Sequence, residues 1–226
     1  MRIFDLNWMQ LEQYLQRDDR IVLPLGSTEQ HAYLSLGTDA ILAERVSVEA
    51  AKPLGVPVLP ALPYGVCPTF AAYPGSPSLG LDTYAAVLGE LIRSLRGQGF
   101  RRVLLVNGHG GNTPAAERVA GDGILWHDWW RAPQISAVMR EIDPVGAHAS
   151  WIENFPWTRL EGVAIPHDPK PAIEAAQLRD LDPQQTRSLL GDGTFGGVYS
   201  YPDEDMLRVW RAGVDEVRGL LEDGWA

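Results

Sequence analysis

Six ionisable side chains could carry chemistry in this chain, and they fall in three short segments. They are Glu29, His31, Asp39, His109, His148 and Glu153. Carboxylates and imidazoles together suit hard-to-borderline divalent ions such as zinc, manganese or iron. Two such ions, roughly 3.5–4 Å apart, can share a hydroxide and polarise a carbonyl at the same time. The residue types therefore suggest a dinuclear metal centre that hydrolyses an amide-like bond, with Asp39 as a candidate bridge.

Each of these residues also has a simpler interpretation. A single Asp or Glu is usually a solvated charge, and a lone histidine is usually structural, which is how we interpret His127 and His167. The turn Gly108-His109-Gly110-Gly111 could instead cradle a phosphate, but it lacks the Lys-Ser/Thr pair that follows in a phosphate loop. Spacing alone does not decide between these interpretations.

Two apolar segments are expected to position the candidates. The segment 101–107 contains an apolar run, Val103 to Val106, that leads to Asn107, and the segment 20–25 contains a similar run that ends before Gly26. Continuous apolar segments of this length indicate strands that are buried on both faces. Because open α/β sheets place ligands at the carboxyl ends of their strands, Glu29, His31 and His109 are expected at one edge.

In the rest of the chain, predicted helices alternate with predicted strands. Helices are expected over 7–17, 39–52, 82–98, 113–120, 147–155 and 203–221, and further strands over 56–62, 123–130 and 134–139. A long loop over 63–81 contains several Pro and Gly residues and is expected to be functional or to contact a subunit. This alternation predicts parallel β-α-β units in one layered α/β domain over 1–226.

Composition narrows the class of protein. A net charge of −10 argues against a nucleic-acid partner, and Cys67 as the only cysteine excludes a disulfide framework or a thiolate zinc site. The segment at the N-terminus lacks the layout of a secretory signal, and no apolar stretch approaches membrane-spanning length. We therefore expect a cytoplasmic enzyme that does not act at a membrane.

Two motifs resemble the creatininase (creatinine amidohydrolase) family. The first is Gly26-Ser27-Thr28-Glu29-Gln30-His31 with Leu36-Gly37-Thr38-Asp39, and the second is Asn107-Gly108-His109-Gly110-Gly111-Asn112. Weaker matches follow the same order, at Tyr64-Gly65, at Tyr73-Pro74-Gly75-Ser76 and at Ala147-His148-Ala149 with Glu153. The resemblance covers about residues 20–155.

The resemblance implies a three-layer α/β/α fold with a mostly parallel central sheet, and a homo-oligomer for which a hexamer built from dimers is the candidate assembly. It also implies two divalent metal ions in each chain, with Zn²⁺ as the first candidate and Mn²⁺ or Fe²⁺ as alternatives. In that arrangement Glu29 and His31 each bind one metal and Asp39 bridges. His109 completes the first site and Glu153 the second, and His148 is catalytic or orients the substrate.

The chain departs from the family pattern at several positions. The segment Ala32-Tyr33-Leu34-Ser35 is one residue shorter than usual and lacks a second histidine. Cys67 and Phe70 stand where many members have Ser and His, and Ala147 replaces an acidic residue before the catalytic histidine. Gly111 stands where creatininase itself has a metal ligand. These differences argue against creatinine itself as the substrate.

We therefore predict a metal-dependent amidohydrolase that cleaves an amide or cyclic amide in a small molecule or a peptide end. A hydroxide held by the two metals attacks the carbonyl, and His148 passes a proton to the leaving nitrogen. Several aromatic side chains are expected to line the substrate pocket, or alternatively a subunit interface: Tyr33, Phe70, Tyr73, Trp151 and Trp157.

Other functions remain open within the family and outside it. They are a peptidase that trims a cofactor-precursor peptide, a formamide hydrolase, a keto-inositol hydrolase, and a non-catalytic member used for binding or assembly. A site for a peptide should be wide and open, whereas the loop 63–81 should close a site for a small ring.

Overall fold

The central sheet consists of three parallel strands in the order β1-β2-β3. The computed structural model describes residues 1–225, and its strands are β1 (Arg20–Leu25), β2 (Arg102–Asn107) and β3 (Ile124–Asp128). The register pairs Leu25 with Asn107 and Asn107 with Asp128. The three strands therefore end together at one edge of the sheet, as expected for the site.

The predicted strand over 56–62 is not a regular strand. This segment runs beside β1 and makes single parallel bridges, Val58 with Val22 and Leu62 with Leu25. Pro57 and Pro60 have no N–H to donate, so a continuous ladder cannot form there.

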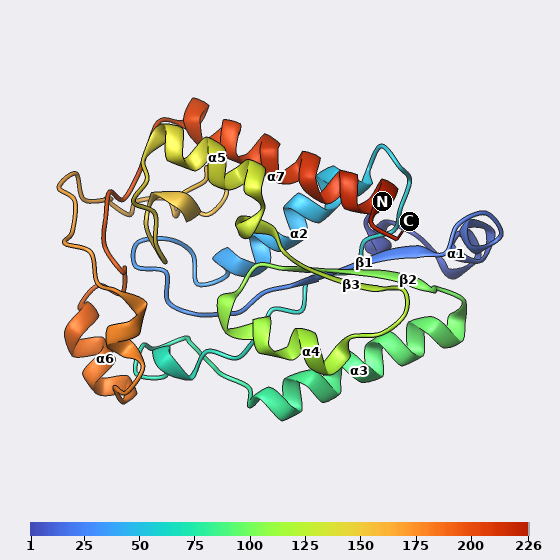
Figure 1. Ribbon diagram of the computed structural model, residues 1–226, viewed down its shortest axis with the longest axis horizontal. Coiled ribbons are helices and arrows are strands. Elements are labelled where there is room, and N and C mark those ends of the chain that lie inside the picture. The colour runs from blue at the N-terminus through green and yellow to red at the C-terminus, as the bar shows by residue number, and fades with distance from the viewer. Residues whose placement is uncertain (226) are drawn as a thin grey trace.

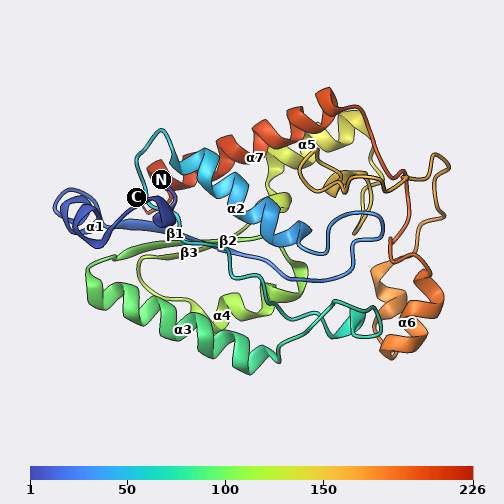
Figure 2. The same ribbon diagram turned by 180° about the vertical axis from the view of Figure 1, so that it is seen from behind.

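Helices cover both faces of the sheet (Figures 1 and 2). On one face lie α2 (Thr38–Ala51), α5 (Pro133–Ile142) and α7 (Asp203–Asp223). On the other lie α3 (Leu81–Gln98) and the single turn α4 (Ala116–Val119). α1 (Trp8–Leu15) lies near the amino ends of the strands, and α6 (Pro183–Leu190) lies beyond their carboxyl ends. The expected three-layer α/β/α fold is confirmed.

Side chains of the buried strands alternate between two apolar cores. Val22, Leu104 and Val106 pack toward α2 and α7, with Trp210 among the largest side chains in that cluster. Ile21, Leu23, Val103 and Leu105 pack toward α3, against residues that include Tyr84 and Leu88. Because both faces are covered, β2 is apolar at each position from Val103 to Val106. The sheet is thus a fixed platform for the loops at its carboxyl edge.

Three predicted elements are corrected by the structure. The segment 134–139 is not a strand but part of helix α5, in which Ile135, Val138 and Met139 share the face toward the core. Pro133 occupies the first turn of α5, where its missing N–H costs nothing. The segment 147–155 holds only a 3₁₀ turn over Trp151–Glu153, and the segment 113–120 holds the end of a 3₁₀ turn and then α4.

The helix predictions over 7–17, 39–52, 82–98 and 203–221 agree with α1, α2, α3 and α7 to within a few residues at each end. Within residues 1–225, none of the helices has the length and apolar character needed to cross a bilayer.

Candidate metal centre

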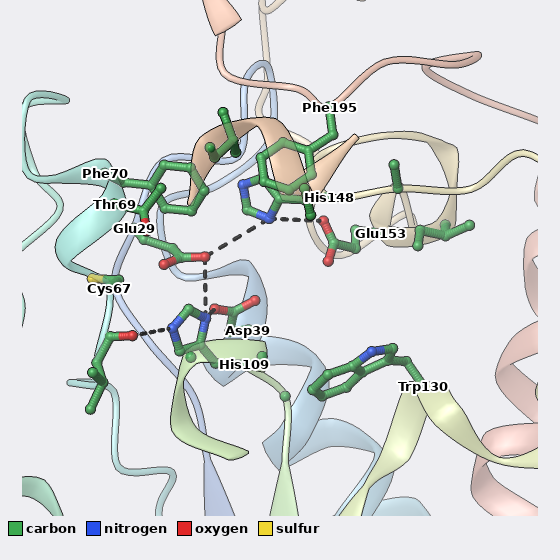
Figure 3. A pocket seen from close by; sticks show the side chains of 18 of the residues that line it. Glu29, Asp39, Cys67, Thr69, Phe70, His109, Trp130, His148, Glu153 and Phe195 are labelled. Atoms are coloured by element: carbon green, nitrogen blue, oxygen red, sulfur yellow. Dashed lines mark hydrogen bonds and ion pairs between the residues drawn. The ribbon is translucent and has the colours of Figure 1, made fainter. Parts of the chain in front are cut away.

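All six candidate side chains meet at the carboxyl edge of the sheet. Figure 3 shows Glu29, Asp39, His109, His148 and Glu153 pointing toward one another. Glu29 lies in the loop after β1, Asp39 in the first turn of α2, and His109 directly after β2. The other two come from the loop that follows α5. Residues far apart in sequence thus share one site.

Two glycines allow Asp39 to reach this position. A Cβ atom at Gly26 would lie 2.5 Å from backbone atoms of Ala40, and one at Gly108 would lie 2.5 Å from the backbone oxygen of Asp39. Any larger residue would therefore push the start of α2 away from the ends of β1 and β2. The two glycines thus let the first turn of α2 approach the strand ends closely enough for Asp39 to reach the site.

Glu29, Asp39 and His109 form the first group of ligand atoms. Nδ1 of His109 lies 3.2 Å from Oε1 of Glu29 and 3.0 Å from Oδ2 of Asp39. All three side chains are buried, since their residues are exposed by 6% or less. One oxygen from each carboxylate and one imidazole nitrogen lie within 4.8 Å of one another, close enough to share an ion.

His31, Asp39 and Glu153 form the second group. Nε2 of His31 lies 3.0 Å from Oδ1 of Asp39 and 3.7 Å from Oε2 of Glu153. Asp39 thus directs one carboxylate oxygen toward each group. This is the arrangement that a bridging carboxylate requires.

Backbone carbonyls orient the two imidazoles. Nδ1 of His31 lies 3.1 Å from the carbonyl oxygen of Glu29, and Nε2 of His109 lies 3.0 Å from that of Val66. When these nitrogens donate, the lone pair of the other nitrogen in each ring faces the carboxylates. Metal-binding histidines are commonly held in this way.

Buried polar atoms in the centre are poorly satisfied. Oε2 of Glu29 has no hydrogen-bond partner, and Nε2 of His31 and Oδ2 of Asp39 have no partner besides their ion-pair contacts with Oδ1 of Asp39 and Nδ1 of His109. Buried polar groups are normally paired, and the ion pairs recorded within residues 1–225 give these carboxylates only histidine as a cationic partner. Unpaired carboxylate oxygens beside imidazoles fit a divalent cation of the zinc or manganese type.

Burial and mutual repulsion shift the pKa values of the centre. Burial raises the pKa of Glu29, and it raises that of Glu153 to about 7 although His31 opposes the shift. Burial would lower the pKa of His31, but Asp39 above all raises it to about 10. Without cations, the carboxylates favour protonation of the neighbouring imidazoles, because a positive ring balances their charge. Bound metal ions would supply that positive charge instead.

His148 lies above both groups and differs from the other two histidines. Its Nδ1 lies 3.9 Å from Oε1 of Glu29 and 4.0 Å from Oε2 of Glu153. Its ring stacks on Phe70, with centroids 4.7 Å apart, and contacts Phe195 at 5.1 Å. Burial, aided by repulsion from His31, holds its pKa well below the ordinary value. The surroundings of His148 therefore favour the neutral ring, which faces both groups with Nδ1.

Gln30 holds the far side of the His148 ring. Nε2 of His148 lies 2.9 Å from the side-chain nitrogen of Gln30 and 3.1 Å from the backbone carbonyl oxygen of the same residue. The same side chain donates to the carbonyl of Gly193 and accepts from the N–H of Ala32. Sequence reasoning did not single out Gln30, although it lies between two candidate ligands.

Gly111 cannot carry a ligand, and Glu153 completes the second group instead. A Cβ atom at Gly111 would lie 1.9 Å from the carbonyl oxygen of Val66, so there is no space for a side chain at that position. The N–H of Ala149 donates to Oε2 of Glu153 at 2.6 Å and aims the carboxylate at His31. The second group thus acquires its third ligand candidate from a different loop.

Two non-glycine residues in this region have positive φ, Ala32 at 50° and Ala149 at 57°. They directly follow His31 and His148. Such conformations are costly for residues with a Cβ and gather at functional sites. Both therefore support a functional role for the neighbouring histidines.

A cavity of about 750 Å³ opens beside the centre. Its lining includes Glu29, Asp39, His109, His148 and Glu153 from the centre, although not His31, together with segment 66–70, Trp130, Arg131, Met139, Ile152, Arg179 and Phe195. Phe195 was not predicted, although the glycine-rich turn that contains it is visible in the sequence. Trp130, Arg131 and Arg179 carry no sequence signal that separates them from surface residues.

The predicted aromatic lining is corrected in part. Phe70 lines the cavity, whereas Tyr33, Tyr73 and Trp151 do not. Trp151 is fully buried and packs in the core against Tyr201, because the 3₁₀ turn points it inward. Tyr73 lies beneath Phe70 with its hydroxyl on the Gly191 carbonyl, and Tyr33 packs on Tyr199. Trp157 stacks on Phe155 and carries the guanidinium of Arg45.

Comparisons with known proteins agree with this architecture. Residues 4–217 match the model of the creatininase family, described as creatinine amidohydrolase. A creatinine amidohydrolase from Pseudomonas putida is 31% identical over 112 residues, which are 46% of this chain and 43% of that protein. A mycofactocin precursor peptide peptidase from Mycolicibacterium smegmatis is 35% identical over 102 residues, 42% of this chain and 41% of that protein.

These alignments span less than half the length of either relative. Among solved structures, a creatininase mutant of Zn–Zn type superposes with a TM-score of 0.81 and 21% identity, covering 99% of this chain and 98% of that one. A manganese form of creatininase gives a TM-score of 0.76 at the same identity and coverage. At this identity the structural likeness shows the fold.

Proposed function

Because this chain belongs to the creatininase family, we propose that it is a metal-dependent amidohydrolase that cleaves an amide or cyclic amide C–N bond. The observation that carries the proposal is Asp39, which directs one carboxylate oxygen to each of two His–carboxylate groups. Unpaired buried atoms in both groups support the same reading.

Three overlapping groups of possible ligand atoms meet here, and the proposed ligand set uses the two that contain Asp39; the third joins Glu29, His31 and His148. Glu29, Asp39 and His109 would hold one divalent cation, and His31, Asp39 and Glu153 the other. We propose Zn²⁺ as the first candidate and Mn²⁺ or Fe²⁺ as alternatives, in line with the nitrogen and oxygen donors. When bound, such a pair supplies Lewis acidity toward a carbonyl and lowers the pKa of water.

The chain itself would supply proton transfer and a dry site. When Nε2 of His148 donates to the backbone carbonyl of Gln30, its Nδ1, which faces both groups, is free to take a proton from water and pass it to the leaving nitrogen. Phe70 and Phe195 fix the plane of its ring, and the wall that they form excludes water on that side.

Metal content and turnover test the proposal together. We expect about two equivalents of divalent metal in each purified chain, and hydrolysis of at least one member of a panel of amides, lactams and formamides that stops after chelation and returns with added metal. A chain that retains no metal under any loading condition and hydrolyses none of the panel would instead be a binding or assembly member of the family.

The size of the cavity favours one alternative. A volume of about 750 Å³ exceeds what a small ring needs, and the segment 66–70 lines it without closing it. Hydrolysis at a peptide end is therefore the second candidate, and the panel should include short peptides of graded length. Formamide and keto-inositol substrates, for which no feature of the cavity argues, serve as further members of the panel.

Assembly, domain organisation and location are further parts of the proposal. We propose one metallohydrolase domain over 1–226, a homo-oligomer for which a hexamer is the candidate, and action in the cytoplasm on a small amide or a peptide end. Light scattering of the purified chain would test the assembly, because a monomer in the active preparation would contradict it.

A further inference from the structure

We propose that the substrate amide has an apolar body and an anionic group, and that Arg131 and Arg179 bind this anion at the mouth of the cavity. The inference rests on the proposed amidohydrolase function and extends it by naming the class of substrate. It follows from the charge and polarity of the cavity lining outside the metal centre.

The charges around the cavity are distributed unevenly. The carboxylates in its lining are Glu29, Asp39 and Glu153, and all three belong to the metal centre. Apart from the centre, the charged side chains that line it within residues 1–225 are Arg131 and Arg179. The whole chain carries a net charge of −10, so a cavity mouth with only positive side chains runs against the overall composition.

Both guanidinium groups have donors to spare. None of the ion pairs formed within residues 1–225 involves Arg179, which is exposed at the surface. Arg131 lies 3.4 Å from Asp128, but that carboxylate already accepts from Asn107, Trp126 and Thr113. Because a guanidinium carries five N–H donors in a planar fork, each arginine can still bind a carboxylate or phosphate.

The two arginines come from different walls. Arg131 ends the 3₁₀ turn after β3, with its guanidinium carbon 5.6 Å from the ring centroid of Trp130. Arg179 follows the 3₁₀ turn Ala175–Leu178, on the way to α6. Both line the cavity and are also exposed to solvent, which places them at its mouth rather than its floor.

The wall between mouth and metal centre is apolar. It includes Phe70, Trp130, Met139, Ile152, Leu178 and Phe195. A substrate that reaches from the cations to the arginines must cross this wall, so its middle part should be aliphatic or aromatic. Acylated ω-amino acids, the ends of apolar peptides and amides with a phosphate at the end of an apolar chain share this chemistry.

A matched pair of probes tests the inference on the metal-loaded protein. 6-Acetamidohexanoate carries the anion at the far end of an aliphatic chain from its amide, and 6-acetamidohexanamide is its neutral counterpart. Calorimetric titration should show tighter binding of the anionic probe by about tenfold, since two partly exposed charge pairs contribute at this level. The preference should decrease as salt is raised, because the arginines are exposed to solvent.

The double variant Arg131→Gln with Arg179→Gln should bind both probes within about threefold of each other while it retains the wild-type metal content. Arg93→Gln, on the exposed face of α3, is the matched control and should keep the preference. Competition by inorganic phosphate and by acetate then shows which anion the mouth favours.

Two results would overturn the inference. One is an equal affinity for both probes in the wild-type protein. The other is a preference that survives in the double variant, which would mean that the metal centre itself binds the carboxylate. Because binding is measured without turnover, a failure here leaves amide hydrolysis untouched, and a failure of hydrolysis leaves this measurement interpretable.

Discussion

Both ends of the sheet carry a cluster of carboxylates, but the two clusters differ in the cationic partners that the chain gives them. At the amino ends, Asp18 pairs with Arg20 at 2.6 Å and with Arg102 at 3.1 Å, and Arg102 also pairs with Asp19. Two acids thus meet two arginines. At the carboxyl ends, three carboxylates meet only histidines, and some of their buried atoms have no partner.

The difference separates a structural charge cluster from a functional one. The amino-end cluster is balanced within the chain, so it needs nothing from outside and contributes to stability alone. The carboxyl-end cluster is unbalanced and buried, which costs free energy unless cations enter it. The functional site is therefore identified by buried carboxylates without enough cationic partners, and not by a cluster of charges alone.

Matched substitutions at the two ends sharpen the comparison. The largest effect is expected from Asp39→Asn, because this residue serves both groups of ligand atoms. Metal content should fall from about two equivalents to less than one, and turnover should drop by more than about 100-fold, the upper range seen when only an outer-shell partner is lost. Elemental analysis and amide hydrolysis measure both. Retention of two metals would remove Asp39 as the bridge.

His109→Ala should have the next largest effect. Its Nδ1 is the only nitrogen in the first group, so at least one equivalent of metal should be lost, and turnover should fall with it. Metal analysis after dialysis checks this. Full occupancy in the variant would refute the ligand assignment.

His148→Ala should separate chemistry from metal binding. Both metals should remain, while turnover falls by about 10² to 10⁴, the usual contribution of a general acid–base group. The same preparation gives metal content and rate. Unchanged turnover would exclude His148 from the mechanism, whereas loss of metal would make it a ligand.

Asp18→Asn is the counterpart at the amino ends and should have the smallest effect. Metal content and turnover should stay at the wild-type level. Stability should fall by about 1–2 kcal/mol through the lost charged hydrogen bonds, which lowers Tm by a few degrees in a chain of this size. Loss of metal in this variant would mean that the two ends are not independent.

The pH dependence of that loss has a definite sign. Burial would raise the pKa of Asp18, but hydrogen bonds from Arg20 hold it below its ordinary value of 3.8. The stabilisation is therefore present above that value and disappears as pH falls through the lower folded pKa. Thermal melts of wild type and Asp18→Asn should converge in acid and differ near neutrality.

Local sequence patterns were sufficient for much of the fold. The strands β1 and β2 were predicted within a residue, because an apolar segment between turn residues has few other uses in a buried sheet. Their carboxyl ends then placed Glu29, His31 and His109 at one edge. Helix α5 also has a signal in the sequence, because Ile135, Val138 and Met139 have the i, i+3, i+4 spacing of one helical face.

The sequence could not place the residues that arrive from the irregular part of the chain. His148 and Glu153 lie in a loop with a single 3₁₀ turn, where neither a helical nor a strand period fixes the direction of a side chain. Trp151, between them, points into the core while its neighbours face the centre. Arg131 and Arg179 also lie at short 3₁₀ turns, so no helical or strand pattern in the sequence indicates that they line the cavity.

The sequence by itself determined strands β1 and β2, helices α2, α3 and α7 and the kinds of ligand available, because these depend on local spacing and hydrophobic burial. Only the tertiary structure decided that Asp39 serves two groups, that Glu153 reaches His31 from a separate loop, and that two arginines stand at the cavity mouth. Those facts depend on how close backbones from separate segments approach each other, and Gly26 and Gly108 set that distance at the centre.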